Sequence, residues 1–131
     1  MRNFLFALIG LVVFFTIVNG QSTKNEKAKL AEKVQTLVDS SAKRPVLRYN
    51  GNKFRDYVTK TPRNYSMIVM FTELSGQRQC AICKQASDEY HMVANSYHFH
   101  LKIYGYLSEY SNRMFFAMVD FDEGPDVFQV R

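Results

Sequence analysis

Two uninterrupted apolar runs, Met67–Phe71 and Met114–Val119, constrain the fold of this chain more than any other feature. Strands with one face in water alternate apolar and polar residues, whereas parallel strands covered on both faces are apolar throughout. Both runs follow the second pattern. We therefore expect two buried parallel strands, with Met67–Phe71 as the central strand of the sheet.

The segments before these runs alternate between helix and strand. A capping box at Thr23–Glu26 precedes an apolar stripe at helical spacing, which predicts an amphipathic helix that ends near Ser41. Val46–Tyr49 is predicted to be a short strand closed by an Asn50-Gly51 turn. Lys53–Lys60 is predicted to be a short helix that carries apolar side chains on one face.

The complete order is strand, helix, strand, helix, strand, in which the second helix opens at Cys80. This order predicts an α/β fold with parallel neighbouring strands and right-handed crossovers. We divide the chain into residues 1–20, a signal peptide, residues 21–45, an amphipathic helix and linker, and residues 46–131, the α/β domain.

The first 20 residues have the organisation of a secretory signal peptide. A short charged n-region precedes the apolar stretch Phe4–Val18, and cleavage is expected before Gln21. Because the stretch is short for a membrane span, an uncleaved anchor is the less favoured alternative. The chain is therefore expected to enter the secretory pathway, where a cysteine pair can be oxidised or can cycle.

The composition excludes several functional classes. The formal net charge of +5 is mild, and in a secretory protein it does not indicate nucleic-acid binding. With 22% charged and 47% apolar residues, the chain is expected to be globular rather than disordered. The two cysteines are too few for a disulfide-dense mini-protein or a four-cysteine zinc site.

Cys80 and Cys83 form a Cys-x-x-Cys motif between an apolar strand and a helix. On the first turn of a helix their Cα atoms are expected roughly 5 to 6 Å apart, a separation that a disulfide tolerates. The free N–H groups and the helix dipole favour a thiolate, most strongly at Cys80, the predicted nucleophile. Cys83, one turn further in, is the predicted resolving thiol. This arrangement near a βαβ pattern is the signature of a thioredoxin-like redox site.

Two other uses of the cysteines stay open. The pair can form a permanently closed structural disulfide, although so small a loop restrains the unfolded chain less than a long one. The second use is a zinc site completed by His98 and His100, but their spacing is shorter than the usual gap of about three to five residues. We expect no metal and no cofactor.

Several short segments of the sequence are shared with one known family. They are Pro62–Ser66, Ile68–Thr72, Gln77–Cys80, Cys83–Ala86, Glu89–Tyr90, Phe115–Gly124 and Asp126–Gln129. In these segments the chain resembles the thioredoxin-like subunit family of the oligosaccharyltransferase complex, of the magnesium transporter and tumour suppressor candidate type. The resemblance runs from about Lys24 to Gln129 and is interrupted once.

The resemblance implies an incomplete thioredoxin-like α/β fold in which Cys80 and Cys83 are the redox-active disulfide. It also implies a protein on the lumenal side of the endoplasmic reticulum that supports N-glycosylation. Its partners would be oligosaccharyltransferase subunits and nascent cysteine-containing glycoproteins, which it would hold through transient mixed disulfides. The implied activity is thiol–disulfide oxidoreductase, since the sugar transfer belongs to another subunit.

Two departures from the family pattern lead to further expectations. Residues 98–110 form a longer connection between the redox helix and the next strand, and the alternation of Phe99, Leu101 and Ile103 predicts an added edge strand or an unstructured bulge. The chain stops at Arg131, before the membrane helices of the family and before the strand that carries its cis-proline. We interpret the sequence as a truncated form that is soluble after signal cleavage.

The sequence leaves two alternative functions and one modification site to consider. The alternatives are a peptide-binding module with a structural disulfide and a truncated isoform without function; magnesium transport has no support, because no pore-forming span is present. Asn64-Tyr65-Ser66 is a formal N-glycosylation acceptor. It abuts a predicted strand, which is expected to restrict access to Asn64.

Overall fold

The computed structural model describes residues 24–77, 80–104 and 114–129. The chain divides into two compact units, Met1–Lys33 and Val34–Arg131. Residues 24–33 are helical, and residues 34–43, which are also helical, open the second unit. The helix ends close to the predicted position, because Pro45 cannot continue it. The predicted signal peptide, 1–20, lies outside the described residues.

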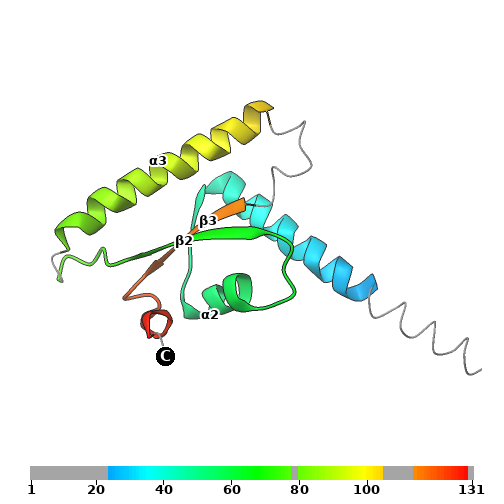
Figure 1. The fold of residues 1–131 in the computed structure, drawn as a ribbon, viewed down its shortest axis with the longest axis horizontal. Coiled ribbons are helices and arrows are strands. Elements are labelled where there is room, and N and C mark those ends of the chain that lie inside the picture. The colour runs from blue at the N-terminus through cyan, green and yellow to red at the C-terminus, as the bar shows by residue number, and fades with distance from the viewer. Residues whose placement is uncertain (1–23, 78–79, 105–113, 130–131) are drawn as a thin grey trace, which may run out of the picture. The chain divides into compact units, whose positions relative to one another are not determined.

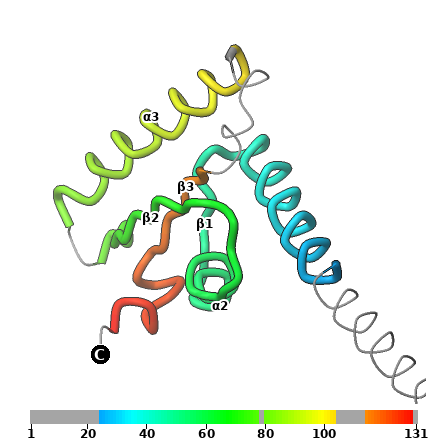
Figure 2. The backbone as a smooth tube through the Cα atoms, turned by 45° about the vertical axis from the view of Figure 1, so that its right-hand side comes forward, coloured from blue at the N-terminus to red at the C-terminus, as the bar shows by residue number. Residues whose placement is uncertain are grey.

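A parallel three-stranded sheet organises the second unit (Figure 1, Figure 2). Its strands are β1 (Val46–Arg48), β2 (Ser66–Thr72) and β3 (Met114–Asp120), in the order β1-β3-β2. Phe116 of β3 lies opposite both Val46 of β1 and Ile68 of β2. The predicted α/β class and the parallel pairing are therefore confirmed.

The expectation that Met67–Phe71 is the central strand is wrong for the described sheet, because β3 lies between the other two strands. Ala117 and Val119 of β3 are fully buried, whereas Ile68 and Phe71 of β2 are 42% and 50% exposed. Both runs are equally apolar, and the strand that comes last in the sequence is the one inserted in the middle. Apolar character alone cannot reveal which strand has two neighbours.

The side chains of β3 alternate between two apolar layers, as the pleat of a strand requires. One layer contains Leu37, Leu47, Tyr49, Tyr65, Phe115, Ala117 and Val119. The other contains Val46, Ala94, Phe116 and Met118. The long helix α3 (Ala81–Tyr104) contributes Ala94 to the second layer, and the short helix α2 (Gly51–Phe54) packs Phe54 against the first. The two helices lie on opposite sides of the sheet (Figure 1).

The predicted helix over Lys53–Lys60 is present as α2 and a following π-helical turn, Arg55–Thr59. The predicted Asn50-Gly51 turn is instead the start of α2. The Asn50 side chain accepts a hydrogen bond from the Lys53 N–H at 3.0 Å, which is the geometry of an N-cap.

The expectation of an added edge strand in 98–110 is wrong for residues 98–104, which continue α3. Tyr90, Ala94, Tyr97 and Leu101 are spaced by four, three and four residues, so the apolar stripe of the helix extends past His98. Phe99 and Ile103 lie off this stripe and are 65% and 52% exposed. The alternation of Phe99, Leu101 and Ile103 therefore does not mark a strand. Leu101 belongs to the apolar stripe of the helix, and Phe99 and Ile103 are exposed apolar side chains on either side of it. Residues 105–110 lie outside the described ranges.

Candidate functional site

A disulfide joins Cys80 and Cys83 at the start of α3. Their Cα atoms are 5.4 Å apart, which agrees with the separation expected from the sequence. Cys80 directly precedes the helix, and the Cys83 N–H donates to the Cys80 carbonyl oxygen at 3.3 Å. The first helical turn therefore brings the two sulfur atoms within bonding reach.

The loop that leads from β2 to the disulfide is anchored by the buried carboxylate of Asp120, the last residue of β3. Asp120 is 4% exposed, and its Oδ2 accepts from the Leu74 N–H at 2.9 Å while its Oδ1 accepts from the Asp122 N–H at 3.1 Å. The Phe121 N–H donates to the Thr72 carbonyl oxygen at 2.9 Å. These bonds hold the carboxyl ends of β2 and β3 together, at the edge where open α/β sheets bind their ligands.

Tyr90 fixes α3 on the sheet. Its hydroxyl lies 2.8 Å from the Ile68 carbonyl oxygen of β2 and 2.9 Å from the Ala117 carbonyl oxygen of β3. Burial raises the pKa of Tyr90 to about 12, and the hydrogen bond to the Ala117 backbone opposes this shift. The hydroxyl therefore remains a protonated donor at neutral pH and holds α3 against two strands.

A cavity of about 290 Å³ opens beside the disulfide. It is lined by Glu73, Leu74, Ser75, Gly76, Cys80, Ala81 and Lys84. Ile82, between the two cysteines, is 72% exposed, and Leu74 is 37% exposed. Cys80 lines the cavity and Cys83 does not. Of the two cysteines, Cys80 is therefore the one that borders this cavity.

The sequence matches a family described as the OST3 / OST6 family, transporter family, over residues 32–130. The chain belongs to the OST3/OST6 family. It is similar to dolichyl-diphosphooligosaccharide–protein glycosyltransferase subunit MAGT1 of Xenopus laevis, with 48% identity over 120 residues that cover 90% of this chain and 34% of the relative. MAGT1 of Homo sapiens is 46% identical over 123 residues, or 94% of this chain and 35% of the relative. MAGT1 of Danio rerio is 49% identical over 127 residues, which cover 92% of this chain and 36% of the relative.

This membership confirms the family resemblance that the shared sequence segments indicated. The OST3/OST6 chain spans about a third of the length of the curated relatives it matches. Its parallel β1-β3-β2 sheet with helices on both faces is the expected incomplete thioredoxin-like α/β fold. Within the described ranges, no helix combines the length and the apolar character needed to cross a membrane.

The histidines of the alternative zinc site lie far from the cysteines. α3 separates Cys83 from His98 by fifteen residues, or about 22 Å along the helix axis. A zinc ion bound to the cysteines is thus beyond the reach of His98 and His100. No cluster of three or more His, Cys, Asp or Glu side chains suited to a metal ion occurs in the part of the chain that the structure describes.

Two residues that position the site were missed as functional candidates in the sequence. In the sequence, Tyr90 fits the apolar stripe of a helix, and its hydroxyl gives no separate signal. Asp120 is the first residue of the acidic segment Asp120-Phe121-Asp122-Glu123, which is typical of a turn. A carboxylate that directly ends a fully apolar strand is the signal that could have identified Asp120 as a buried acceptor.

Proposed function

We propose that this OST3/OST6 chain is an accessory redox subunit of oligosaccharyltransferase that acts in the lumen of the endoplasmic reticulum. Its clients are nascent cysteine-containing glycoproteins. The observation that carries the proposal is the Cys80–Cys83 disulfide at the start of α3, with Cys80 lining an open cavity. The names of the relatives, subunits of a dolichyl-diphosphooligosaccharide–protein glycosyltransferase, support a partnership with other subunits of that complex.

The proposed reaction is thiol–disulfide exchange. A client thiolate attacks the Sγ atom of Cys80, the Cys80–Cys83 bond breaks, and its electron pair leaves on the Sγ atom of Cys83. Attack by the Cys83 thiolate on Cys80 of the mixed disulfide then restores the original bond and releases the client thiolate. If a second client thiolate attacks the client sulfur instead, the client is oxidised by two electrons and the Cys80–Cys83 pair is left reduced.

The start of α3 favours this exchange electrostatically. A thiolate that leaves on Cys83 lies in the first turn of the helix, where backbone N–H groups have no carbonyl partner within the helix. Together with the positive end of the helix dipole, these groups stabilise negative charge on sulfur. The same effect acts on a thiolate at Cys80, immediately before the helix.

The surroundings of the pair suit an unfolded peptide. Ile82 and Leu74 present exposed apolar side chains beside Cys80, and Lys84 adds a positive charge at the cavity. An extended client segment can therefore place apolar side chains on this surface while its thiol reaches Cys80. A transient bond would delay client oxidation and keep acceptor asparagines accessible to the glycosylating subunit.

A trapping experiment in cells tests the proposal. In the Cys83→Ser variant, Cys80 can still form a mixed disulfide, but no thiol resolves it. We expect non-reducing gels and mass spectrometry to show glycoproteins bound to this variant well above the level of a Cys80→Ser/Cys83→Ser control. Equal amounts on both variants would refute the exchange mechanism. Coprecipitation of oligosaccharyltransferase subunits with the double variant tests the partnership separately.

The closed bond also favours a second candidate, a peptide-binding module whose disulfide is purely structural. In that case no glycoprotein is found disulfide-linked to the Cys83→Ser variant. Unfolded peptides would then bind the oxidised wild-type chain beside Ile82 without any covalent link. An Ile82→Asp variant would abolish such binding while leaving the disulfide closed.

A further inference from the structure

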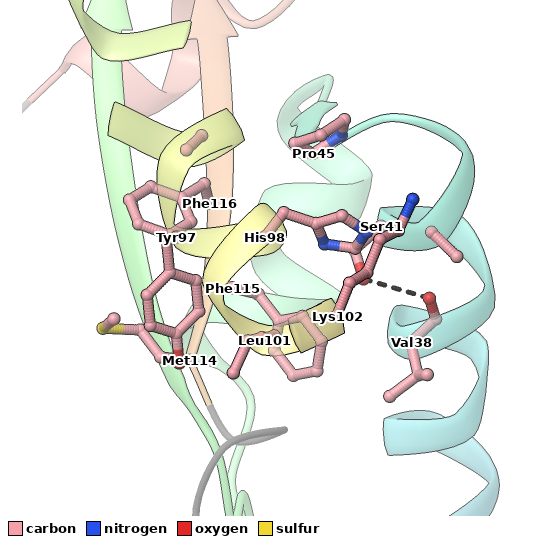
Figure 3. Close-up of a pocket in the computed structure, with 12 residues that line it drawn as sticks. Val38, Ser41, Pro45, Tyr97, His98, Leu101, Lys102, Met114, Phe115 and Phe116 are labelled. Atoms are coloured by element: carbon pink, nitrogen blue, oxygen red, sulfur yellow. Dashed lines mark hydrogen bonds between the residues drawn. The ribbon is translucent and has the colours of Figure 1, made fainter. Parts of the chain in front are cut away.

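A second cavity lies near the far end of α3 from the disulfide (Figure 3). Its volume is about 310 Å³, and it is an open hollow lined by α3, the start of β3 and the helix of residues 34–43. Ala94, Tyr97, Leu101 and Phe116 contribute apolar surface to its wall. Because about 22 Å of helix separates Cys83 from this end of α3, the cavity is distinct from the redox site.

Polar groups gather on one side of this apolar cavity, from Ser41, His98 and Lys102 (Figure 3). The His98 Nε2 atom is buried and has no hydrogen-bond partner among the described residues. The Ser41 hydroxyl donates to the Val38 carbonyl oxygen at 3.0 Å, which leaves its lone pairs to accept. Because the Nε2 atom has almost no accessible surface, the His98 ring forms part of the wall and offers no hydrogen bond to a ligand in the cavity.

The described lining residues of the cavity carry charge of one sign. Lys102 is the only charged side chain among the described lining residues, and none of those residues is acidic. Burial lowers the pKa of His98, and the positive charge of Lys102 lowers it further, so the imidazole is neutral at pH 7. An ammonium group beside an apolar hollow complements an anionic head on an apolar body.

We propose that this cavity binds a small organic carboxylate with an apolar body, of the size of octanoate or 3-phenylpropionate. The volume lies at the lower end of the range of roughly 300–1,000 Å³ that is typical of small-molecule sites, which favours a small ligand. The apolar body packs against Tyr97, Leu101 and Phe116. The carboxylate pairs with the Lys102 ammonium group.

An NMR titration of the isotope-labelled full chain tests this proposal, with octanoate as the probe and octanamide as its uncharged analogue. We expect octanoate to shift the amide signals of residues that line the cavity and to bind at least about threefold more tightly than octanamide. The Lys102→Met variant is expected to remove this preference. The matched Lys43→Met variant, whose exposed lysine lies outside the cavity lining, is expected to keep it.

A variant that fills the cavity gives an independent readout. Ala42 is exposed and lines the cavity, so Ala42→Trp is expected to block octanoate binding without altering the core. Ala31→Trp, at an exposed position outside the lining, serves as the control. Absence of shifts with octanoate, equal affinity for octanamide, or binding that survives Ala42→Trp would each overturn the proposal. The Cys80→Ser/Cys83→Ser variant is expected to bind octanoate normally, so this outcome is independent of the redox function.

Discussion

The Asp120 carboxylate accepts a hydrogen bond from the Leu74 N–H at 2.9 Å, which joins the end of the central strand to the loop that leads to the disulfide. Asp120 is buried, and the same carboxylate also accepts from the Asp122 N–H. The residue thus completes the hydrogen bonding of two turns at once. The position of the Cys80–Cys83 pair therefore depends on a carboxylate outside the Cys-x-x-Cys motif.

Replacing Asp120 tests this dependence. Asp120→Ala leaves the Leu74 and Asp122 N–H groups without their acceptor, which is expected to lower the free energy of unfolding by about 1–3 kcal/mol. Urea denaturation monitored by circular dichroism measures the change. The exposed neighbour Asp122 provides the control, because Asp122→Ala keeps its own backbone N–H and is expected to lower stability by less than Asp120→Ala does. Equal effects of the two variants would show that the Asp120 bonds are not important for stability.

Leu37 tests whether the helix of residues 34–43 belongs to the core of the second unit. Its side chain is 2% exposed and packs in the layer that contains Phe115 and Val119. Leu37→Ala is expected to cost about 2–5 kcal/mol in unfolding free energy, because it leaves a cavity. Leu30→Ala, at a half-buried position on the preceding turns, is expected to cost clearly less. Chemical denaturation of both variants distinguishes them, and similar losses would contradict the packing.

Much of the fold follows from sequence patterns, because apolar period and capping are local properties. The runs at Met67–Phe71 and Met114–Val119 are strands, and the Cys-x-x-Cys pair opens a helix as predicted. Which strand is central was not predictable from either run, since strand order depends on contacts between distant segments. The burial of Ala117 between two layers is a consequence of that order.

The site was predicted less completely than the fold. Cys80 and Cys83 were evident from their spacing, but the groups that position them act through tertiary hydrogen bonds. Tyr90 reaches carbonyl oxygens 22 and 27 residues away, and Asp120 reaches Leu74 across 46 residues. A sequence pattern confined to a few neighbouring residues cannot predict such distant hydrogen-bond partners.

Tyr90 gives a prediction about pH. Tyr90→Phe removes the hydroxyl that bonds to Ile68 and Ala117, and it is expected to lower the unfolding free energy by about 1 kcal/mol at pH 7. Burial raises the pKa of Tyr90 from 10.0 to about 12, so the folded state favours the protonated form. The stability that this residue contributes is therefore complete below pH 10 and is lost as the pH rises towards 12.

The difference in stability between the parent chain and Tyr90→Phe should accordingly shrink between pH 10 and 12. Urea titrations across this range measure it, in a Cys80→Ser/Cys83→Ser background that removes disulfide chemistry at high pH. A difference that stays constant over this range would contradict the buried, protonated donor.

Asn64 gives a prediction about modification. Contrary to the restricted access expected from the sequence, Asn64 is exposed and lies before the first residue of β2. We expect a glycan on Asn64 when the chain is expressed in cells that deliver it to the endoplasmic reticulum. A shift in gel mobility after peptide N-glycosidase treatment detects it. The shift should vanish in Asn64→Gln and in Ser66→Ala, and a wild-type chain without any shift would contradict the prediction.

The central claim is that the Cys80–Cys83 disulfide opens and closes reversibly, and a redox titration tests it most directly. The full chain is equilibrated in glutathione buffers of known potential, and the reduced fraction is measured by alkylation and mass spectrometry. A reversible pair is expected to have a reduction potential above about −300 mV, within reach of the glutathione pool. A bond that remains closed in every buffer down to about −300 mV would contradict the account, because structural disulfides lie below that value.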